Sequence, residues 1–132
     1  MIKKTFIFPI FVLSSIILIS HSAATYFYLY WMTPWIDIPN HLLGGAIVSL
    51  IFWSLAFRLK TDFFTNNSRF FSLFIGLIVG FLWEVFELHY SITSMGAPGY
   101  FADSSLDILN SIVGVFIAFY FFIKPEIEND TE

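Results

Sequence analysis

Four long apolar segments are the feature that most constrains how this chain can fold. They cover residues 6–30, 37–57, 70–90 and 105–123. Each has roughly 19 to 25 residues, enough to cross a ~30 Å hydrocarbon core at ~1.5 Å per residue. A segment in lipid must satisfy its own backbone hydrogen bonds, so each should be a helix. With 58% hydrophobic and 12% charged residues, a soluble domain would lack polar surface. The sequence therefore predicts an all-α bundle of four transmembrane helices, forming one membrane domain over residues 1–132.

The basic residues predict the orientation of this bundle. All six fall before the first segment, around the second link, or after the fourth segment: Lys3, Lys4, Arg58, Lys60, Arg69 and Lys124. The positive-inside rule makes this end cytoplasmic. Both termini, the acidic tail at 124–132 and the 58–69 link should then lie inside, in a bacterial inner or plasma membrane. The 31–36 and 91–104 links should face outward, with an aromatic belt of Tyr26, Tyr28, Tyr30, Trp31 and Trp35.

Two function classes are excluded by composition. Apart from the acidic tail the charge is near zero, so there is no basic surface for nucleic acid. The chain has no cysteine, which rules out disulfides, thiolate catalysis and cysteine-ligated zinc.

The first segment has two interpretations. Two lysines, an apolar run to Ile19 and the small-residue stretch at 20–24 are also typical of a cleaved secretory signal. Apolar residues continue through Met32, which is longer than an ordinary signal and favours a retained helix. Cleavage would leave the other three helices oriented as above.

Ionisable residues lie within the outer part of the predicted spans, where charge is rare unless it serves a function. At ~100° per residue, each of three helices carries polar groups and glycine on one stripe. The stripes are Asp37, His41 and Gly44; Glu84, Glu87, Gly76 and Gly80; and Asp103, Asp107, Asn110 and Gly114. Glycine lets helix backbones approach closely. We therefore expect the stripes to face one another and to form a polar pocket open to the outside.

Such a pocket needs a countercharge. No Lys or Arg lies at this depth, and clustered carboxylates cannot all be ionised and unpaired. Either protons are shared or a cation is bound; carboxylate with imidazole suits Zn²⁺, Mn²⁺ or Fe²⁺, and carboxylates alone suit Ca²⁺ or Mg²⁺. The expected ligands of a divalent metal ion are His41, Glu84, Glu87 and Asp107, with Glu84 and Asp103 as candidate catalytic residues. The spacing matches neither the Glu-x-x-His of di-iron bundles nor His-Glu-x-x-His.

Several of these residues also have an ordinary structural explanation. Asp37 and Asp103 could be helix N-caps at the membrane surface. Asn110 is better explained as an interhelical hydrogen bonder than as a ligand, and His89 as an interfacial residue. His21, in the middle of the first segment, is more typical of a packed polar contact than of a site residue. Trp83 is assigned to packing or to lipid.

Three motifs carry a family resemblance. They are D-I-P-N-H-L-L-G-G at 37–45, W-E-V-F-E at 83–87 and D-S-S-L-D-I-L-N-S-I-V-G at 103–114. Together they resemble the VanZ-like family and the related YjdF-like small bacterial membrane proteins. VanZ-like members carry Gln where this chain has Glu87, and an Arg before the last motif that is missing here, so the chain is more similar to the YjdF-like side. The resemblance implies a helical membrane fold, and for the VanZ-like role it implies handling of envelope material.

Three functions are compatible with these features. The first is a metal-dependent enzyme acting at the outer leaflet on a lipid-linked or cell-envelope substrate. The second is a binding or transport protein for a cation or a polar headgroup, and the third is a scaffold whose polar groups only join helices. Membrane lipids are the expected partners, and a conducting path through so narrow a bundle would require a homo-oligomer.

Overall fold

The protein is an all-helical bundle in the computed structural model, which describes residues 6–59, 62–92 and 94–130. Four helices in these ranges are long and apolar enough to cross a membrane, as predicted. They are α1 (Ile7–Tyr26), α3 (Asp37–Leu59), α5 (Ser68–His89) and a continuous helix over Tyr100–Glu128. The last comprises α6 (Tyr100–Ala118), a π-helical turn (Phe119–Ile123) and α7 (Lys124–Asp130). Short helices in the links are α2 (Leu29–Met32), η1 (Pro34–Ile36) and α4 (Asp62–Asn66).

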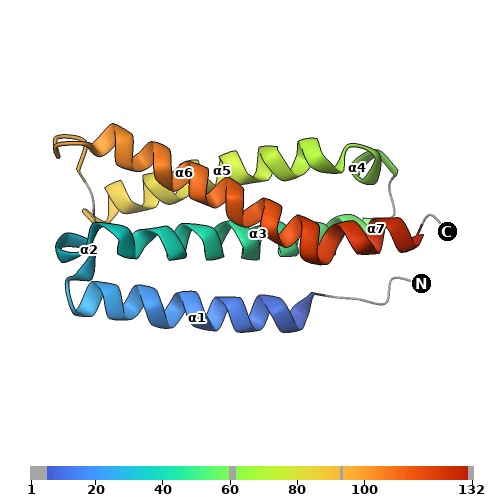
Figure 1. The fold of residues 1–132 in the computed structure, drawn as a ribbon, viewed down its shortest axis with the longest axis horizontal. Helices are drawn as coiled ribbons and strands as arrows, with labels where there is room; N and C mark the ends of the chain where they lie inside the picture. The colour runs from blue at the N-terminus through green and yellow to red at the C-terminus, as the bar shows by residue number, and fades with distance from the viewer. Residues whose placement is uncertain (1–5, 60–61, 93, 131–132) are drawn as a thin grey trace.

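Helix α3 is the central element of the bundle. α5 and α6 pack against it and against each other, whereas α1 lies along the other side of α3 (Figure 1). The start of α1, α4 and α7 lie at one end, and α2 and the α5–α6 link lie at the opposite end (Figure 1). Arg58, Arg69 and Lys124 therefore belong to one end, and the polar residues of the three stripes to the other.

Glycines bring three of the helices into backbone contact. A Cβ on Gly76 or Gly80 would lie 2.9 or 2.8 Å from a Cα atom of α6. On α3 the glycine at the contact is Gly45, against the Ser111 backbone, and Gly114 of α6 meets the backbone of Leu42. The expected contact through Gly44 is wrong, because that residue has ordinary space beside side chains of α1 and α5.

The half of the bundle away from the polar stripes is filled by apolar side chains. Leu50, Trp53 and Phe57 of α3 pack with Phe119 and Ile123 of the fourth span. The one polar group of Trp53, Nε1, donates a hydrogen bond to Ser72 Oγ at 3.3 Å. This packing closes the bundle below the polar end.

The first span is shorter than predicted. α1 ends at Tyr26 rather than at residue 30, because Tyr28 adopts the left-handed conformation with φ of 58°. This conformation is costly for a residue with a Cβ and marks a sharp turn. The chain then folds back through α2, and Tyr30 becomes half-buried. The predicted belt is wrong for Tyr30; Tyr26, Tyr28, Trp31 and Trp35 are exposed.

The fourth span is longer than predicted at both ends. It starts five residues earlier, at Tyr100, where Gly99 has φ of 83° and its carbonyl accepts N–H bonds from Ala102 and Asp103. It continues past Ile123 through the first part of the acidic tail. There Lys124 and Glu128 form an i,i+4 ion pair at 3.5 Å, a spacing that supports helix.

Candidate metal centre

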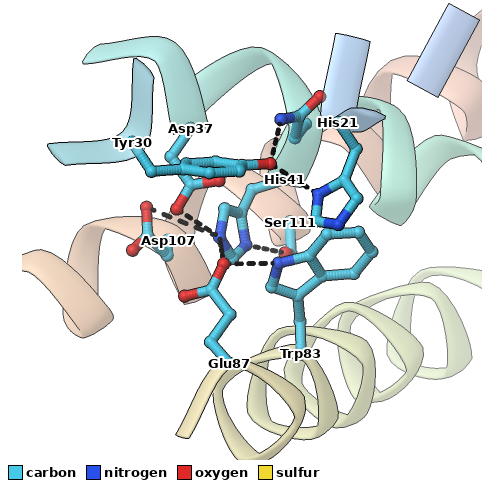
Figure 2. Close-up of polar contacts among 9 residues, drawn as sticks. His21, Tyr30, Asp37, His41, Trp83, Glu87, Asp107 and Ser111 are labelled. Carbon is cyan, nitrogen blue, oxygen red and sulfur yellow. Dashed lines mark hydrogen bonds and ion pairs between the residues drawn. The ribbon is translucent and has the colours of Figure 1, made fainter. Parts of the chain in front are cut away.

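His41 lies at the centre of the polar end of the bundle. It occupies the second turn of α3 and its side chain is fully buried. Its Nε2 is 3.3 Å from Oδ2 of Asp37, one helical turn earlier. Its Nδ1 is 3.4 Å from the hydroxyl of Ser111 on α6, which fixes the ring from the other side (Figure 2).

Carboxylates from two further helices surround the same nitrogen. Nε2 of His41 is 3.8 Å from Asp107 Oδ1 on α6 and 3.9 Å from Glu87 Oε1 on α5. Glu84, one turn before Glu87, completes the cluster. Ligand atoms of Asp37, His41 and Asp107 lie within 4.8 Å of one another, and so do those of His41, Glu84 and Glu87. Each expected ligand thus lies in one of two groups that share His41, and Asp37 belongs to the group with Asp107.

These carboxylates lack a basic partner other than His41. Glu84, Glu87 and Asp107 are at most 5% exposed, and no described Lys or Arg side chain is within 4.0 Å of them. Oε1 of Glu84 and Oδ1 of Asp37 are buried without a hydrogen-bond partner. A buried charge without compensation costs several kcal/mol. The cluster therefore requires either a cation or shared protons.

The spacing suits a small divalent ion. Ligands at 2.0–2.2 Å in tetrahedral geometry would be about 3.3–3.6 Å apart. The distances from His41 Nε2 to Asp37, Asp107 and Glu87, 3.3 to 3.9 Å, need only slight contraction. The set of one imidazole and several carboxylates matches the preferences of Zn²⁺, Mn²⁺ and Fe²⁺.

Hydrogen bonds from a second layer orient the cluster. The indole Nε1 of Trp83 donates to Oε1 of Glu87 at 2.9 Å. On the α1 side, the hydroxyl of Tyr30 accepts a bond from Asn40 Nδ2 at 2.8 Å and lies 2.6 Å from Nδ1 of His21 (Figure 2). Ser20 donates to Oδ1 of Asn40 at 2.6 Å, so this chain of bonds ties α1 to α3. Burial, with the charges of Asp37 and Glu87, raises the pKa of Tyr30, which keeps its hydroxyl protonated.

A cavity of about 1090 Å³ lies over the cluster at the end of the bundle. Its walls come from α2, the α5–α6 link and the start of α6, and Asp37 and Glu87 line it together with Tyr30. Asp103 is exposed and lines the same cavity. The cluster is therefore buried but has a polar approach from one side.

A comparison with protein families matches residues 2–125 to the family described as "Predicted membrane protein (DUF2238)". The chain belongs to this family. With its four apolar helices, this member is a multi-pass membrane protein. Searches of curated proteins and of solved structures returned no match.

The structure of this family member separates the remaining candidates. Asp103 is in neither group of possible metal ligands. Asp37 does not act as a cap within the described part of the chain, since its Oδ2 faces His41 Nε2 and its Oδ1 has no hydrogen-bond partner there. His89 is exposed against Tyr90, as expected for an interfacial residue. His21 reaches the site through the Tyr30 hydroxyl and through an edge-on ring contact with Trp83.

Three site residues escaped the sequence interpretation. The first is Ser111, which faces His41. Its neighbour Asn110, the expected hydrogen bonder, is half-buried without a hydrogen bond to another described helix. The sequence interpretation places Trp83 in packing or against lipid, although its position four residues before Glu87 indicates an i,i+4 contact. Tyr30 could not be found in this way, because its place depends on the turn at Tyr28.

Proposed function

We propose that this membrane protein binds one divalent metal ion through His41, Glu84, Glu87 and Asp107, with Asp37, which is grouped with His41 and Asp107, as the alternative ligand. The observation that carries the proposal is the buried, unpartnered Oε1 of Glu84 beside His41 and Glu87. Such an oxygen is well suited to be a metal ligand. Second-layer bonds to ligands, as made here by Trp83 and Ser111, are typical of metal sites.

We further propose that the ion serves an enzyme acting on a lipid-linked or cell-envelope substrate. A bound ion could activate water or polarise a phosphoryl oxygen. The polar head of the substrate would enter the cavity lined by Asp37, Glu87 and Asp103. Asp103, exposed there and outside both ligand groups, is suited to be the general base, and Glu84 is the second candidate. An envelope substrate is what the resemblance implies for the VanZ-like role, from which this chain departs at Glu87 and in the missing Arg.

A protein that only binds or transports a cation or a polar headgroup is the second candidate. It would use the same ligands. The packed residues Leu50, Trp53 and Phe119 below the site favour a one-sided binding or reaction site over a conducting path. In a scaffold, the third candidate, the carboxylates would share protons around a charged His41.

Elemental analysis of the protein purified in detergent tests the metal. We expect about one divalent ion per chain in the wild type and its loss in Asp107→Asn. Asp103→Asn is the matched control, because it makes the same chemical change one turn away on α6, outside the ligand groups. This variant should keep its metal.

Removing the charges of Glu84 and Glu87 distinguishes a bound metal ion from carboxylates that share protons. A double Glu84→Gln/Glu87→Gln variant should lose the ion and become less stable, because amides supply no charge. If the carboxylates share protons, the amides are nearly isosteric and the variant should be as stable as the wild type. Wild-type protein without stoichiometric metal, together with a stable double variant, would contradict the proposed site and favour the scaffold.

A further inference from the structure

An apolar groove runs along the lipid-facing side of the bundle and ends at Trp83 and Phe86, beside the candidate ligands Glu84 and Glu87. It has a volume of about 530 Å³ and lies between α1, α3 and α5. Its apolar lining comprises Val48, Phe52, Ile75, Ile78, Val79, Leu82 and Phe86. Among the described residues that line it, only His21 and Trp83 carry polar side-chain groups. Because its walls are membrane spans, the groove opens to hydrocarbon and not to water.

The groove has the depth of one leaflet. Along α5 it extends from Phe86 to Ile75, about 16 Å at ~1.5 Å per residue. This is half of a ~30 Å hydrocarbon core. Phe86 lies one residue from the ligand Glu87, so the groove occupies the half of the membrane that contains the cluster. The hydrocarbon chain of a lipid whose headgroup lies at the surface of this leaflet would therefore end near Ile75.

The end of the groove is joined to the cavity above the cluster by two hydrogen bonds. His21, which lines the groove, contacts the Tyr30 hydroxyl at 2.6 Å, and Tyr30 lines the cavity. Trp83, which also lines the groove, donates to Glu87 at 2.9 Å, and Glu87 lines the cavity. Two hydrogen-bonded pairs of side chains, His21 with Tyr30 and Trp83 with Glu87, thus form the boundary between the apolar groove and the polar cavity.

We propose that this groove holds the hydrocarbon chain of a lipid whose polar head lies in the cavity at the metal centre. The proposal rests on the proposed function and narrows its substrate to a membrane lipid with at least one long chain. His21 and Trp83 then stand at the junction of chain and head, where an amphipathic side chain contacts both. A water-soluble substrate would use only the cavity.

Native mass spectrometry of delipidated protein, with phosphatidylglycerol as the probe, tests the groove. Val79 is half-buried in its wall, and Val79→Trp would fill it. We expect one bound lipid in the wild type and binding at least about tenfold weaker in Val79→Trp, the effect of expelling roughly two methylene groups. Val48→Phe, a smaller change in the same wall, should weaken binding in the same direction.

The chain provides a matched control for this experiment. A second apolar groove of about 430 Å³ lies on the other flank of α1; it is lined by Ile117, and none of its described lining residues is ionisable. Ile117→Trp fills that groove and should leave lipid binding unchanged. Equal loss in Ile117→Trp, or retained lipid in both Val79→Trp and Val48→Phe, would overturn the proposal.

Metal content measured on the same samples separates this proposal from the metal centre. Val79→Trp should keep its ion, because Val79 is not a ligand. A wild type that binds lipid in a groove-dependent way but holds no metal would contradict only the metal centre. A wild type that holds metal but binds no lipid would contradict only the groove.

Discussion

Two neighbouring glycines of α3 provide a sharp test of the helix packing. A Cβ on Gly45 would lie 2.9 Å from the carbonyl carbon of Ser111 and closer still to its oxygen. A Cβ on Gly44 would meet only side-chain atoms, at 3.7 Å and beyond. The contact at Gly45 is backbone, so relief requires that α3 and α6 move apart by roughly 1 Å, which forfeits a quarter to a half of each affected contact.

Both residues are in the middle of the same helix, so Ala gains the same helix propensity at each, about 0.5–1 kcal/mol. Gly44→Ala should therefore be neutral or slightly stabilising. Gly45→Ala adds the cost of overpacking, about 1–3 kcal/mol. Because the propensity term is common, the difference between the two variants isolates the helix–helix contact.

The measurement is the free energy of unfolding in detergent, for both variants in one preparation. Gly45→Ala should be less stable than Gly44→Ala by about 1–3 kcal/mol. Equal stabilities would show that α3 and α6 are not in backbone contact at Ser111. The convergence of Asp107 and His41, which depends on that contact, would then lose its basis.

Three further predictions concern topology and the surroundings of the site. Reporter fusions at Thr65 and Asp130 should both report the cytoplasm, because the basic residues lie at that end; an outside signal from either would reverse the side of the cavity. Trp83→Phe should weaken metal binding about 10–100-fold in chelator competition, as loss of a second-layer bond does, whereas Trp53→Phe, far from the cluster, should not. In a spectrophotometric titration, the wild type minus Tyr30→Phe difference should show a phenol that ionises above the ordinary tyrosine pKa of ~10. Above pH ~10 the wild type should lose more stability than Tyr30→Phe, because the phenol then ionises more readily in the unfolded chain than in the folded one. A difference signal at the ordinary pKa would contradict the burial of Tyr30.

The fold, and the presence of the candidate ligands at one end of the bundle, could be predicted from the sequence because both depend on local periodicity. Apolar length gives the spans, and a ~100° advance per residue places His41, Glu84 and Asp107 on stripes that also carry glycine. What periodicity could not predict is the exact contact along a stripe. Gly45 instead of Gly44, and Ser111 instead of Asn110, differ by one residue, since the packing of neighbouring helices decides which of two adjacent residues faces the partner.

The contribution of the first link could not be predicted at all. Tyr30 belongs to an interfacial aromatic run, and such residues ordinarily face lipid headgroups. A single left-handed residue, Tyr28, redirects the chain so that Tyr30 reaches Asn40 and His21. No periodic pattern encodes this, because the cost of the turn is offset by tertiary hydrogen bonds that only the folded bundle supplies.

The contact between Gly45 and Ser111 also couples stability to the proposed metal binding. Gly45 lies one turn below His41 on α3, and Ser111 holds Nδ1 of His41 while its backbone packs on Gly45. A shift of roughly 1 Å between the helices would therefore move Asp107 and Ser111 together relative to His41. Geometric errors of this size matter at a metal site, where ligand distances are held within about 0.2 Å. Gly45→Ala should thus lower metal content as well as stability, whereas Gly44→Ala should lower neither. A Gly45→Ala protein with full metal content would show that the ligand positions do not depend on the backbone contact between α3 and α6.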